Sequence, residues 1–467
     1  MSNIGTPLPR STPLQEGVSA ISIALFNRAL ERSSAHMRGY VLLRHGKVAA
    51  ERYWEPYSAA DKNFVYSAAK SFTTTAAGMA CDAGLLDLDA PVLSFFPDKA
   101  PEEPNENLRA MCVRHLLSMN SGHGTDTTIP MVFSPDPDWV KCFLQMPVDH
   151  EPGSYFEYNS GATYVVSAIL QQITGETVYD YLKKRLFEPL GFGDTAHDLS
   201  PQGVFPGGWG LVVRLEDLAK LGQLYLDKGV YNGQRFLSEE WVALASANHS
   251  DNGRPGRENE PADWRQGYGF QFWRCQHNAF RADGAAGQYC IVMPEQDAVL
   301  AMMSEVANMQ ELMDPVWEFL LPGFSNTSAE RESAVSGKTI QLKRMAPFDT
   351  ACLRFSDREL ELTFTEDDEI YSQRFGRGFW LENVGTLHMG ERLILPTFAL
   401  DISKELVSAY FHWKDEATLE LCWAYRETPH RERLVCYFED DTVSFLCHSS
   451  VSVPRDEDDW DFEGKIV

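Results

Sequence analysis

The sequence lacks most features that mark a membrane, secreted or nucleic-acid-binding protein. No apolar run reaches the length of a membrane span. The N-terminus has no basic start followed by an apolar stretch and a cleavage site, so we expect no secretory signal. Basic residues are scarce, with 41 Lys and Arg against 67 Asp and Glu. The resulting net charge of −26 argues against nucleic acid or an anionic membrane as a partner.

The cysteines show no pattern typical of a disulfide framework or a zinc site. The nine cysteines are odd in number, scattered, and never spaced as Cys-x-x-Cys. His115 and His123 likewise have no second ligand at metal spacing. We therefore expect reduced thiols in a cytoplasmic protein, with no metal ion and no other cofactor.

Length and periodicity predict two domains. At 467 residues the chain exceeds one ordinary core, and its 44% hydrophobic content is typical of a folded protein. Residues 39–54 have the pattern of a β-hairpin, helical spacing follows between 67 and 246, and apolar strands recur over 269–303. This order predicts an α+β domain over residues 1–325, in which an antiparallel sheet is assembled from both ends and flanked by helices.

The remainder of the chain has a different texture. Residues 326–338 are polar and without periodicity, which predicts a linker. Residues 339–467 contain alternating segments such as 359–365 and 442–446, separated by acidic turns. This alternation predicts an antiparallel all-β domain, either a barrel or a sandwich. Residues 456–463 are rich in Asp and Glu and are expected to form a solvated acidic tail.

The first candidate for chemistry is the pair Ser67 and Lys70, where an Ala- and Thr-rich helical segment begins. Positions three apart on a helix share a face, so the amine can accept the proton of the hydroxyl. The helix N-terminus would favour negative charge on the nucleophile, and burial would lower the pKa of the lysine. The alternative is a helix-capping or first-turn serine beside a solvated lysine.

Two further segments could complete a site around Ser67. Tyr158 follows a Pro-Gly-Ser turn at a loop–helix junction, where a phenol could shuttle a proton, although Tyr155 and Tyr164 compete for this role. The loop 281–288 is glycine-rich and precedes an apolar strand. One of its N–H groups, paired with the amide of Ser67, would make an oxyanion hole. Each segment has an ordinary structural alternative, a packing tyrosine or a plain turn.

The order of these motifs resembles the serine β-lactamase and penicillin-binding-protein superfamily. The closest similarity is to its class C-like branch of esterases, amidases and nylon-oligomer hydrolases. Intervening segments resemble landmarks of that family as well, and together they span roughly residues 15–320. These landmarks are Gly84–Val92, Val113–Gly122, Gly207–Ala219 and Asn232–Trp241.

The resemblance implies a role for each candidate residue. Ser67 would be acylated, Lys70 would deprotonate it, and Tyr158 would pass the proton to the leaving group and activate the deacylating water. The amides of Ser67 and Ala285 would form the oxyanion hole, with Gly284 of the same loop also facing the substrate. This arrangement is similar to a Ser-His-Asp triad with Lys and Tyr as the partners.

Two positions depart from the family pattern. Ser160 stands where the lactamases have Asn, and it is the expected substrate-binding residue of the second motif. Ala282 stands where the third motif carries Lys or His. Without that cation, a carboxylate-bearing lactam loses its anchor. Arg281 is adjacent, but alternation along a strand would point it to the other face.

These observations predict a serine hydrolase that cleaves a small ester or amide through an acyl-serine intermediate. One alternative is a D-amino-acyl peptidase, amidase or β-lactamase of the same mechanism. The other is a non-catalytic acyl-binding or sensing module. The expected partner is a small-molecule substrate, and the sequence leaves homo-oligomerisation open.

Overall fold

The computed structural model of this chain contains two compact units. It describes residues 5–13, 15–253, 256–324, 328–343, 346, 348–356, 358–367, 369–387, 405–414, 417–426, 431–449 and 459–467. One unit comprises residues 1–11 and 30–314, and the other comprises residues 12–29 and 315–467. Within the described ranges, no helix combines the length and apolar character needed to cross a membrane. Each unit has its own apolar core, so the two are described in turn.

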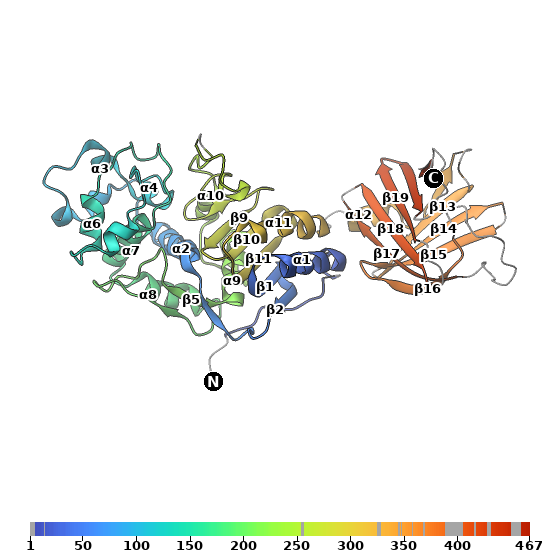
Figure 1. The fold of residues 1–467 in the computed structure, drawn as a ribbon, viewed down its shortest axis with the longest axis horizontal. Coiled ribbons are helices and arrows are strands. Elements are labelled where there is room, and N and C mark those ends of the chain that lie inside the picture. The colour runs from blue at the N-terminus through green and yellow to red at the C-terminus, as the bar shows by residue number, and fades with distance from the viewer. Residues whose placement is uncertain are drawn as a thin grey trace. The chain divides into compact units, whose positions relative to one another are not determined.

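A six-stranded antiparallel sheet forms the centre of the first unit, in the order β2-β1-β11-β10-β9-β8. Its strands are β1 (His36–Arg44), β2 (Lys47–Tyr53), β8 (Trp273–Arg274), β9 (Phe280–Gly284), β10 (Gln288–Met293) and β11 (Ala298–Glu305). The early hairpin meets the late strands directly, because β1 pairs with β11 and places Val41 opposite Ala301. The predicted sheet, assembled from both ends of this region, is therefore confirmed (Figure 1).

Both faces of the sheet are covered, because its central strands are apolar on both sides. Every residue of β10 is buried. The Cys290 thiol donates to the Leu218 carbonyl of helix α9 (Leu215–Leu226) at 3.3 Å. The neighbouring Tyr289 points to the opposite face, where its hydroxyl donates to the Met309 carbonyl at 3.1 Å, just before α11 (Gln310–Pro315).

Helices and two small sheets make up the rest of this unit. The helices are α2 (Ala69–Asp82), α3 (Glu106–Ala110), α4 (Val113–Leu117), α5 (Thr128–Val132), α6 (Trp139–Gln145), α7 (Ser160–Thr174), α8 (Val178–Leu182) and α10 (Glu239–Ser246). The short strands are β3 (Lys62–Phe64), β4 (Ala196–His197), β5 (Leu211–Arg214), β6 (Val230–Tyr231) and β7 (Gln234–Arg235). Helix α2 contacts both α7 and β9, so it lies between the helical region and the large sheet (Figure 1).

The second unit is built around a closed β-barrel. Nine strands form a ring that the parallel pairing of β15 with β17 closes, and β16 pairs with the outer side of β17. The strands are β12 (Thr339–Leu342), β13 (Thr350–Phe355), β14 (Glu359–Glu366), β15 (Glu369–Arg377), β16 (Leu381–Gly385), β17 (Glu405–Trp413), β18 (Thr418–Tyr425), β19 (Arg431–Glu439), β20 (Thr442–Ser449) and β21 (Asp459–Ile466). Of the two predicted architectures, barrel and sandwich, the barrel is correct.

Two segments of this unit differ from the expectation from sequence. The acidic tail was expected to be solvated, but its described part belongs to β21, which pairs with β20 and β12. That strand buries Phe462 in the barrel core, so the apolar residue outweighs its acidic neighbours. Within the segment predicted as a linker, helix α12 (Ser328–Val335) forms. Its Glu332 accepts hydrogen bonds from the Trp413 indole at 2.9 Å and from Arg377, which attaches α12 to the barrel.

Candidate active site

Ser67 lies in a short 3₁₀ turn (Tyr66–Ala68) that leads directly into α2. Tyr66, the residue before it, has a φ of +47°, in the left-handed region that side-chain-bearing residues rarely occupy. Such strain costs about 1–3 kcal/mol and is commonly found at functional sites. Ser67 itself is half-buried, so its hydroxyl remains reachable. No side chain caps the start of α2, and this excludes the interpretation of Ser67 as a helix cap.

Lys70 lies one turn further along and is only 1% exposed. Its Nζ donates to Ser67 Oγ at 3.0 Å and to the Gly208 carbonyl at 3.0 Å. Burial lowers the pKa of this amine to about 7, although the nearby carboxylates of Asp126 and Asp283 act in the opposite direction. Lys70 is therefore not a solvated surface lysine, and a large fraction of it is neutral at physiological pH.

Tyr158 precedes α7 and lies against the same lysine. The Lys70 Nζ is 4.8 Å from the centroid of the Tyr158 ring, which also stacks on Trp273 with centroids 5.3 Å apart. Burial raises the pKa of the phenol above its usual value, while a hydrogen bond with the Ser67 hydroxyl acts to lower it. Because burial has the larger effect, the phenol stays protonated at neutral pH, and the hydrogen bond keeps it within reach of Ser67.

The two competing tyrosines are occupied elsewhere. The Tyr155 ring stacks on His150 with centroids 3.8 Å apart. The buried Tyr164 hydroxyl is 3.1 Å from Ser200 Oγ. Of the three candidates, Tyr158 is the one in contact with Lys70.

The two residues after Tyr158 have different roles: Asn159 caps helix α7, and Ser160 lies near the nucleophile. Asn159 is fully buried and its Oδ1 caps α7, accepting from the amides of Gly161 at 3.0 Å and Ala162 at 3.3 Å. Ser160 lies closer to the nucleophile. A Cβ built on Gly208 would be 3.4 Å from Ser160 Cβ and 3.5 Å from Lys70 Nζ, so this glycine packs against both residues.

The third motif closes the site from the edge of the large sheet. A Cβ on Gly284 would lie 2.1 Å from the Val65 carbonyl oxygen, so only glycine lets β9 approach the Ser67 turn this closely. The next residue, Ala285, is exposed. Two hydrogen bonds with Ser304 of β11 hold the loop: Gln288 Nε2 donates to the Ser304 carbonyl at 2.6 Å, and Ser304 Oγ donates to the Ala286 carbonyl at 2.9 Å.

Arg281 does not supply the cation that Ala282 lacks. Arg281 is fully buried and donates to Asp283 Oδ2 and to the Asp263 carbonyl, both at 2.8 Å. Its guanidinium also lies 4.3 Å from the centroid of the Trp264 ring. The Arg281 guanidinium therefore pairs with buried groups of the protein and is not free to bind a substrate carboxylate. Ala282 is completely buried.

Four aromatic residues of this unit, Trp209, Trp264, Tyr268 and Trp273, separate into two groups. Tyr268 and Trp273 are buried together with Phe156, and Trp264 packs against them, so these rings form core behind Tyr158. Trp209 lies apart, against Trp139 with centroids 6.1 Å apart.

His115 and His123, which have no second ligand at metal spacing in the sequence, make local hydrogen bonds. The His115 ring accepts from the Cys112 amide at 3.0 Å, and His123 Nδ1 lies 3.0 Å from Ser121 Oγ. In the part of the chain that the structure describes, no group of three or more His, Cys, Asp or Glu side chains is placed to hold a metal ion.

Three residues of the site were missed from sequence: Asp126, Gly208 and Asp283. Asp283 adjoins Gly284 within a loop already selected, so its acidic character could have been noticed. Gly208 lies within the landmark Gly207–Ala219, which the sequence had selected without a role at the site, whereas Asp126 comes from a distant loop and carries no local signal.

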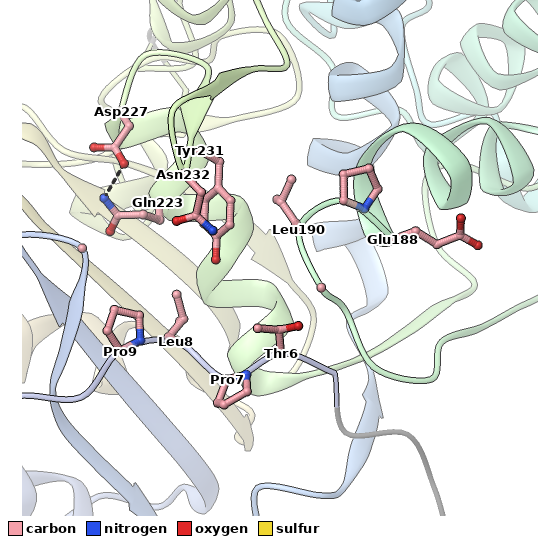
Figure 2. Close-up of a pocket in the computed structure, with 13 residues that line it drawn as sticks. Thr6, Pro7, Leu8, Pro9, Glu188, Leu190, Gln223, Asp227, Tyr231 and Asn232 are labelled. Atoms are coloured by element: carbon pink, nitrogen blue, oxygen red, sulfur yellow. Dashed lines mark hydrogen bonds between the residues drawn. The ribbon is translucent and has the colours of Figure 1, made fainter.

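A separate surface hollow lies away from this site. Figure 2 shows it between the N-terminal segment Thr6–Pro9, the loop Glu188–Gly191 and the residues Gln223, Asp227, Tyr231 and Asn232. Gln223 Nε2 donates to Asp227 Oδ2 at 2.9 Å on its wall. None of the residues that line this hollow belongs to the three motifs around Ser67.

Comparison with known proteins gives a match over most of the first unit. Residues 26–319 match the Beta-lactamase family. The 6-aminohexanoate-dimer hydrolase of Paenarthrobacter ureafaciens is 23% identical over 281 residues, which cover 57% of this chain and 71% of the relative. The lovastatin esterase of Penicillium rubens is 28% identical over 163 residues, which cover 30% of this chain and 41% of that enzyme.

A solved structure extends the similarity to the second unit. The octameric penicillin-binding protein homologue from Pyrococcus abyssi superposes with a TM-score of 0.50 at 15% sequence identity. The superposition covers 91% of this chain and 97% of the homologue. At this identity the likeness establishes a shared fold.

Proposed function

The chain belongs to the beta-lactamase family over residues 26–319, and on this premise we propose that it is a serine hydrolase that cleaves a small ester or amide through an acyl intermediate on Ser67. The observation that carries the proposal is the hydrogen bond from Lys70 Nζ to Ser67 Oγ at 3.0 Å, made by a buried amine. A hydroxyl beside a base that can be neutral is an activated nucleophile.

The proposed acylation uses groups already in contact. Neutral Lys70 takes the proton of Ser67 as Oγ attacks the substrate carbonyl carbon, and the carbonyl oxygen becomes an oxyanion. The amides of Ser67 and Ala285 would stabilise this charge. The tetrahedral intermediate collapses as the bond to the leaving group breaks, and the Tyr158 phenol delivers a proton to the departing oxygen or nitrogen. The phenol is reprotonated from the Lys70 ammonium.

Deacylation repeats these steps with water as the nucleophile. Water loses a proton to the Tyr158–Lys70 pair while its oxygen attacks the acyl carbon. The bond to Ser67 Oγ then breaks, and the serine recovers its proton. The products are the free acid and the regenerated enzyme.

We propose an ester or simple amide ahead of a β-lactam, because among the described residues the site offers no free cation for a lactam carboxylate. Ala282 replaces the cation of the third motif, and Arg281 is engaged by Asp283 and the protein interior. The names of the two relatives support hydrolysis: one is a hydrolase of the 6-aminohexanoate dimer and the other an esterase. Peptidase or lactamase activity is the second candidate. The buried, contacting Ser67–Lys70 pair argues against a non-catalytic module.

We also propose a reducing, cytoplasmic setting and self-association. The nine cysteines are all free, which suits a reducing compartment. The Pyrococcus abyssi homologue is described as octameric, and this supports the proposal that the present chain also forms oligomers. Light scattering coupled to size-exclusion chromatography measures that assembly directly.

The test of the proposed function is covalent labelling of Ser67. We expect a fluorophosphonate to add one adduct by intact mass, and a panel of p-nitrophenyl esters to be turned over. Ser67→Ala should abolish both signals. Tyr158→Phe, which keeps the ring on Trp273, should lower kcat by roughly 10²–10⁴-fold.

Ser154→Ala is the matched control, because Ser154 is exposed and its hydroxyl donates only to the nearby Glu151 carbonyl. It should be labelled like the wild type. Ester turnover that survives in Ser67→Ala would show that another residue is the nucleophile.

A further inference from the structure

Asp126, a carboxylate with no cationic partner among the described residues, lies near the Lys70 amine and Tyr158. Asp126 Oδ1 accepts from the Ser160 amide at 3.2 Å, from the Thr128 amide at 3.1 Å and from Thr128 Oγ1 at 2.6 Å. Ser160 in turn packs on Gly208, whose carbonyl accepts from Lys70. Asp126 is therefore joined to Lys70 through two intervening residues, Ser160 and Gly208.

The second oxygen of this carboxylate is available to a ligand. The hydrogen bonds that hold Asp126 all use Oδ1, and among the described residues none is made to Oδ2. The hydrogen bonds to Oδ1 fix the direction in which Oδ2 points. Asp126 is only half-buried, so solvent can reach its side chain. A carboxylate oxygen held in this way is preorganised to accept a charge-assisted hydrogen bond.

The other charged groups near the site are already paired. Asp283 accepts from Arg281 at 2.8 Å. Arg257, whose guanidinium lies 5.2 Å from the centroid of the Phe156 ring, is 3.7 Å from Glu260. Lys70 is held by Ser67 and Gly208. In the described part of the chain, Asp126 has no ion pair, so the site carries an uncompensated negative charge.

We propose that Asp126 determines substrate specificity by binding a positively charged group of the substrate. The preferred substrates are then esters or amides that carry a protonated amine or a quaternary ammonium near the scissile bond, and substrates with a carboxylate there are disfavoured. This inference rests on the proposed hydrolase function. The net charge of −26 acts in the same direction, because it raises the local concentration of cationic substrates.

We expect kcat/KM to differ strongly between esters that are alike except for the charge on the acyl chain. A hydrogen bond to a charged group contributes enough to change an equilibrium by roughly tenfold to a hundredfold. The probes are three p-nitrophenyl esters of similar length whose acyl chains end in a trimethylammonium, a methyl or a carboxylate group. For the wild type we expect kcat/KM to fall in that order, with about tenfold or more between the first and the second.

Substitution of Asp126 should change the ratios between these esters. Asp126→Asn keeps the size and the Oδ1 contacts, and should reduce the preference for the cationic over the neutral ester by about tenfold. Asp126→Lys should invert the order of the cationic and anionic esters. Asp149→Asn is the matched control, because this exposed carboxylate lies against Gly124, two residues before Asp126, and its substitution changes the net charge equally. It should keep the wild-type ratios.

The outcomes separate this inference from the proposed function. Ser67-dependent turnover with an order of preference that Asp126→Asn leaves intact would overturn the role of Asp126 while leaving the hydrolase standing. An equal fall for all three esters would also overturn it, since that result assigns Asp126 to catalysis or folding. Absence of Ser67-dependent turnover of any of the three would contradict both.

Discussion

The surroundings of the Lys70 amine set the pH range in which it can accept the proton of Ser67. Its Nζ has two hydrogen-bond acceptors, Ser67 Oγ and the Gly208 carbonyl, and almost no contact with solvent. Desolvation disfavours the ammonium form, and the resulting pKa of about 7 is near the optimum for a general base at neutral pH. The negative charges of Asp126 and Asp283 favour the ammonium form and so prevent a larger fall in the pKa of Lys70.

The first prediction concerns the pH dependence of acylation. Lys70 must be neutral to accept a proton, and its lowered pKa means that the neutral form dominates above about pH 7. We expect kcat/KM for a neutral ester to rise about tenfold per pH unit below this value and to level off above it. Stopped-flow or initial-rate profiles between pH 5 and pH 9 measure this limb, with Ser67→Ala as the blank. A limb near the ordinary pKa of lysine would contradict the assignment of Lys70 as the base.

At the scale of the elements, the site depends on the contact between strand β9 and the Ser67 turn. The two come from distant parts of the chain, and Gly284 allows their backbones to meet at Val65. Helix α7 contributes in a similar way, because its buried cap Asn159 fixes the residue that precedes it, Tyr158. In both cases a residue with no direct chemical role, Gly284 or Asn159, fixes the position of a group that the proposed reaction uses.

The second prediction follows from the close approach at Gly284. In Gly284→Ala the new methyl group would collide with the Val65 carbonyl oxygen, which is part of the backbone and cannot rotate away. We expect β9 to move from the turn, and kcat to fall by roughly 10²-fold as the oxyanion contacts lengthen. KM for a neutral ester should change less, since binding of the acyl chain does not need the oxyanion hole.

Gly233→Ala is the control for the loss of a glycine elsewhere. A Cβ there meets no atom within 4 Å, although its φ of +78° makes the substitution mildly strained. Its kcat should match the wild type while its melting temperature falls slightly. If Gly284→Ala kept the wild-type kcat, the third motif would not take part in the reaction.

At the scale of the whole molecule, two separate cores indicate two folding units. The first core joins α2, α7 and the large sheet, and the second fills the barrel. We propose the boundaries that the sequence suggests, a hydrolase domain over 1–325 and a β domain over 339–467, joined by 326–338. The barrel contains Trp423, which is completely buried and packs edge-on against Phe375 at 5.6 Å.

The third prediction separates the two units by calorimetry. Trp423→Ala removes the largest buried side chain of the barrel and should destabilise it by about 3–5 kcal/mol. We expect two thermal transitions in the wild type, of which only one moves in the variant. Trp380→Ala, which replaces a half-exposed tryptophan of the same unit, should leave both transitions close to their positions. A single transition that shifts as a whole in Trp423→Ala would contradict independent units.

Much of the architecture was predictable because it rests on local periodicity. The helical spacing predicted between 67 and 246 includes α7 and α9, and the alternation over 359–365 corresponds to β14. The choice between barrel and sandwich was not predictable, because it depends on whether β15 reaches β17 to close the ring. The acidic tail was misjudged because charge was given more weight than the apolar residue Phe462.

Ser67, Lys70 and Tyr158 could be selected from the sequence because each belongs to a local pattern, and their catalytic roles stay predictions. The sequence by itself determined the helical spacing that puts Lys70 over Ser67, and the missing cation at Ala282. Only the tertiary structure decided that this lysine is buried, that Gly284 approaches Val65, and that Asp126 lies near Lys70 without an ionic partner among the described residues. Those properties depend on packing between segments far apart in the chain, whereas spacing on one helix is fixed by the geometry of the backbone.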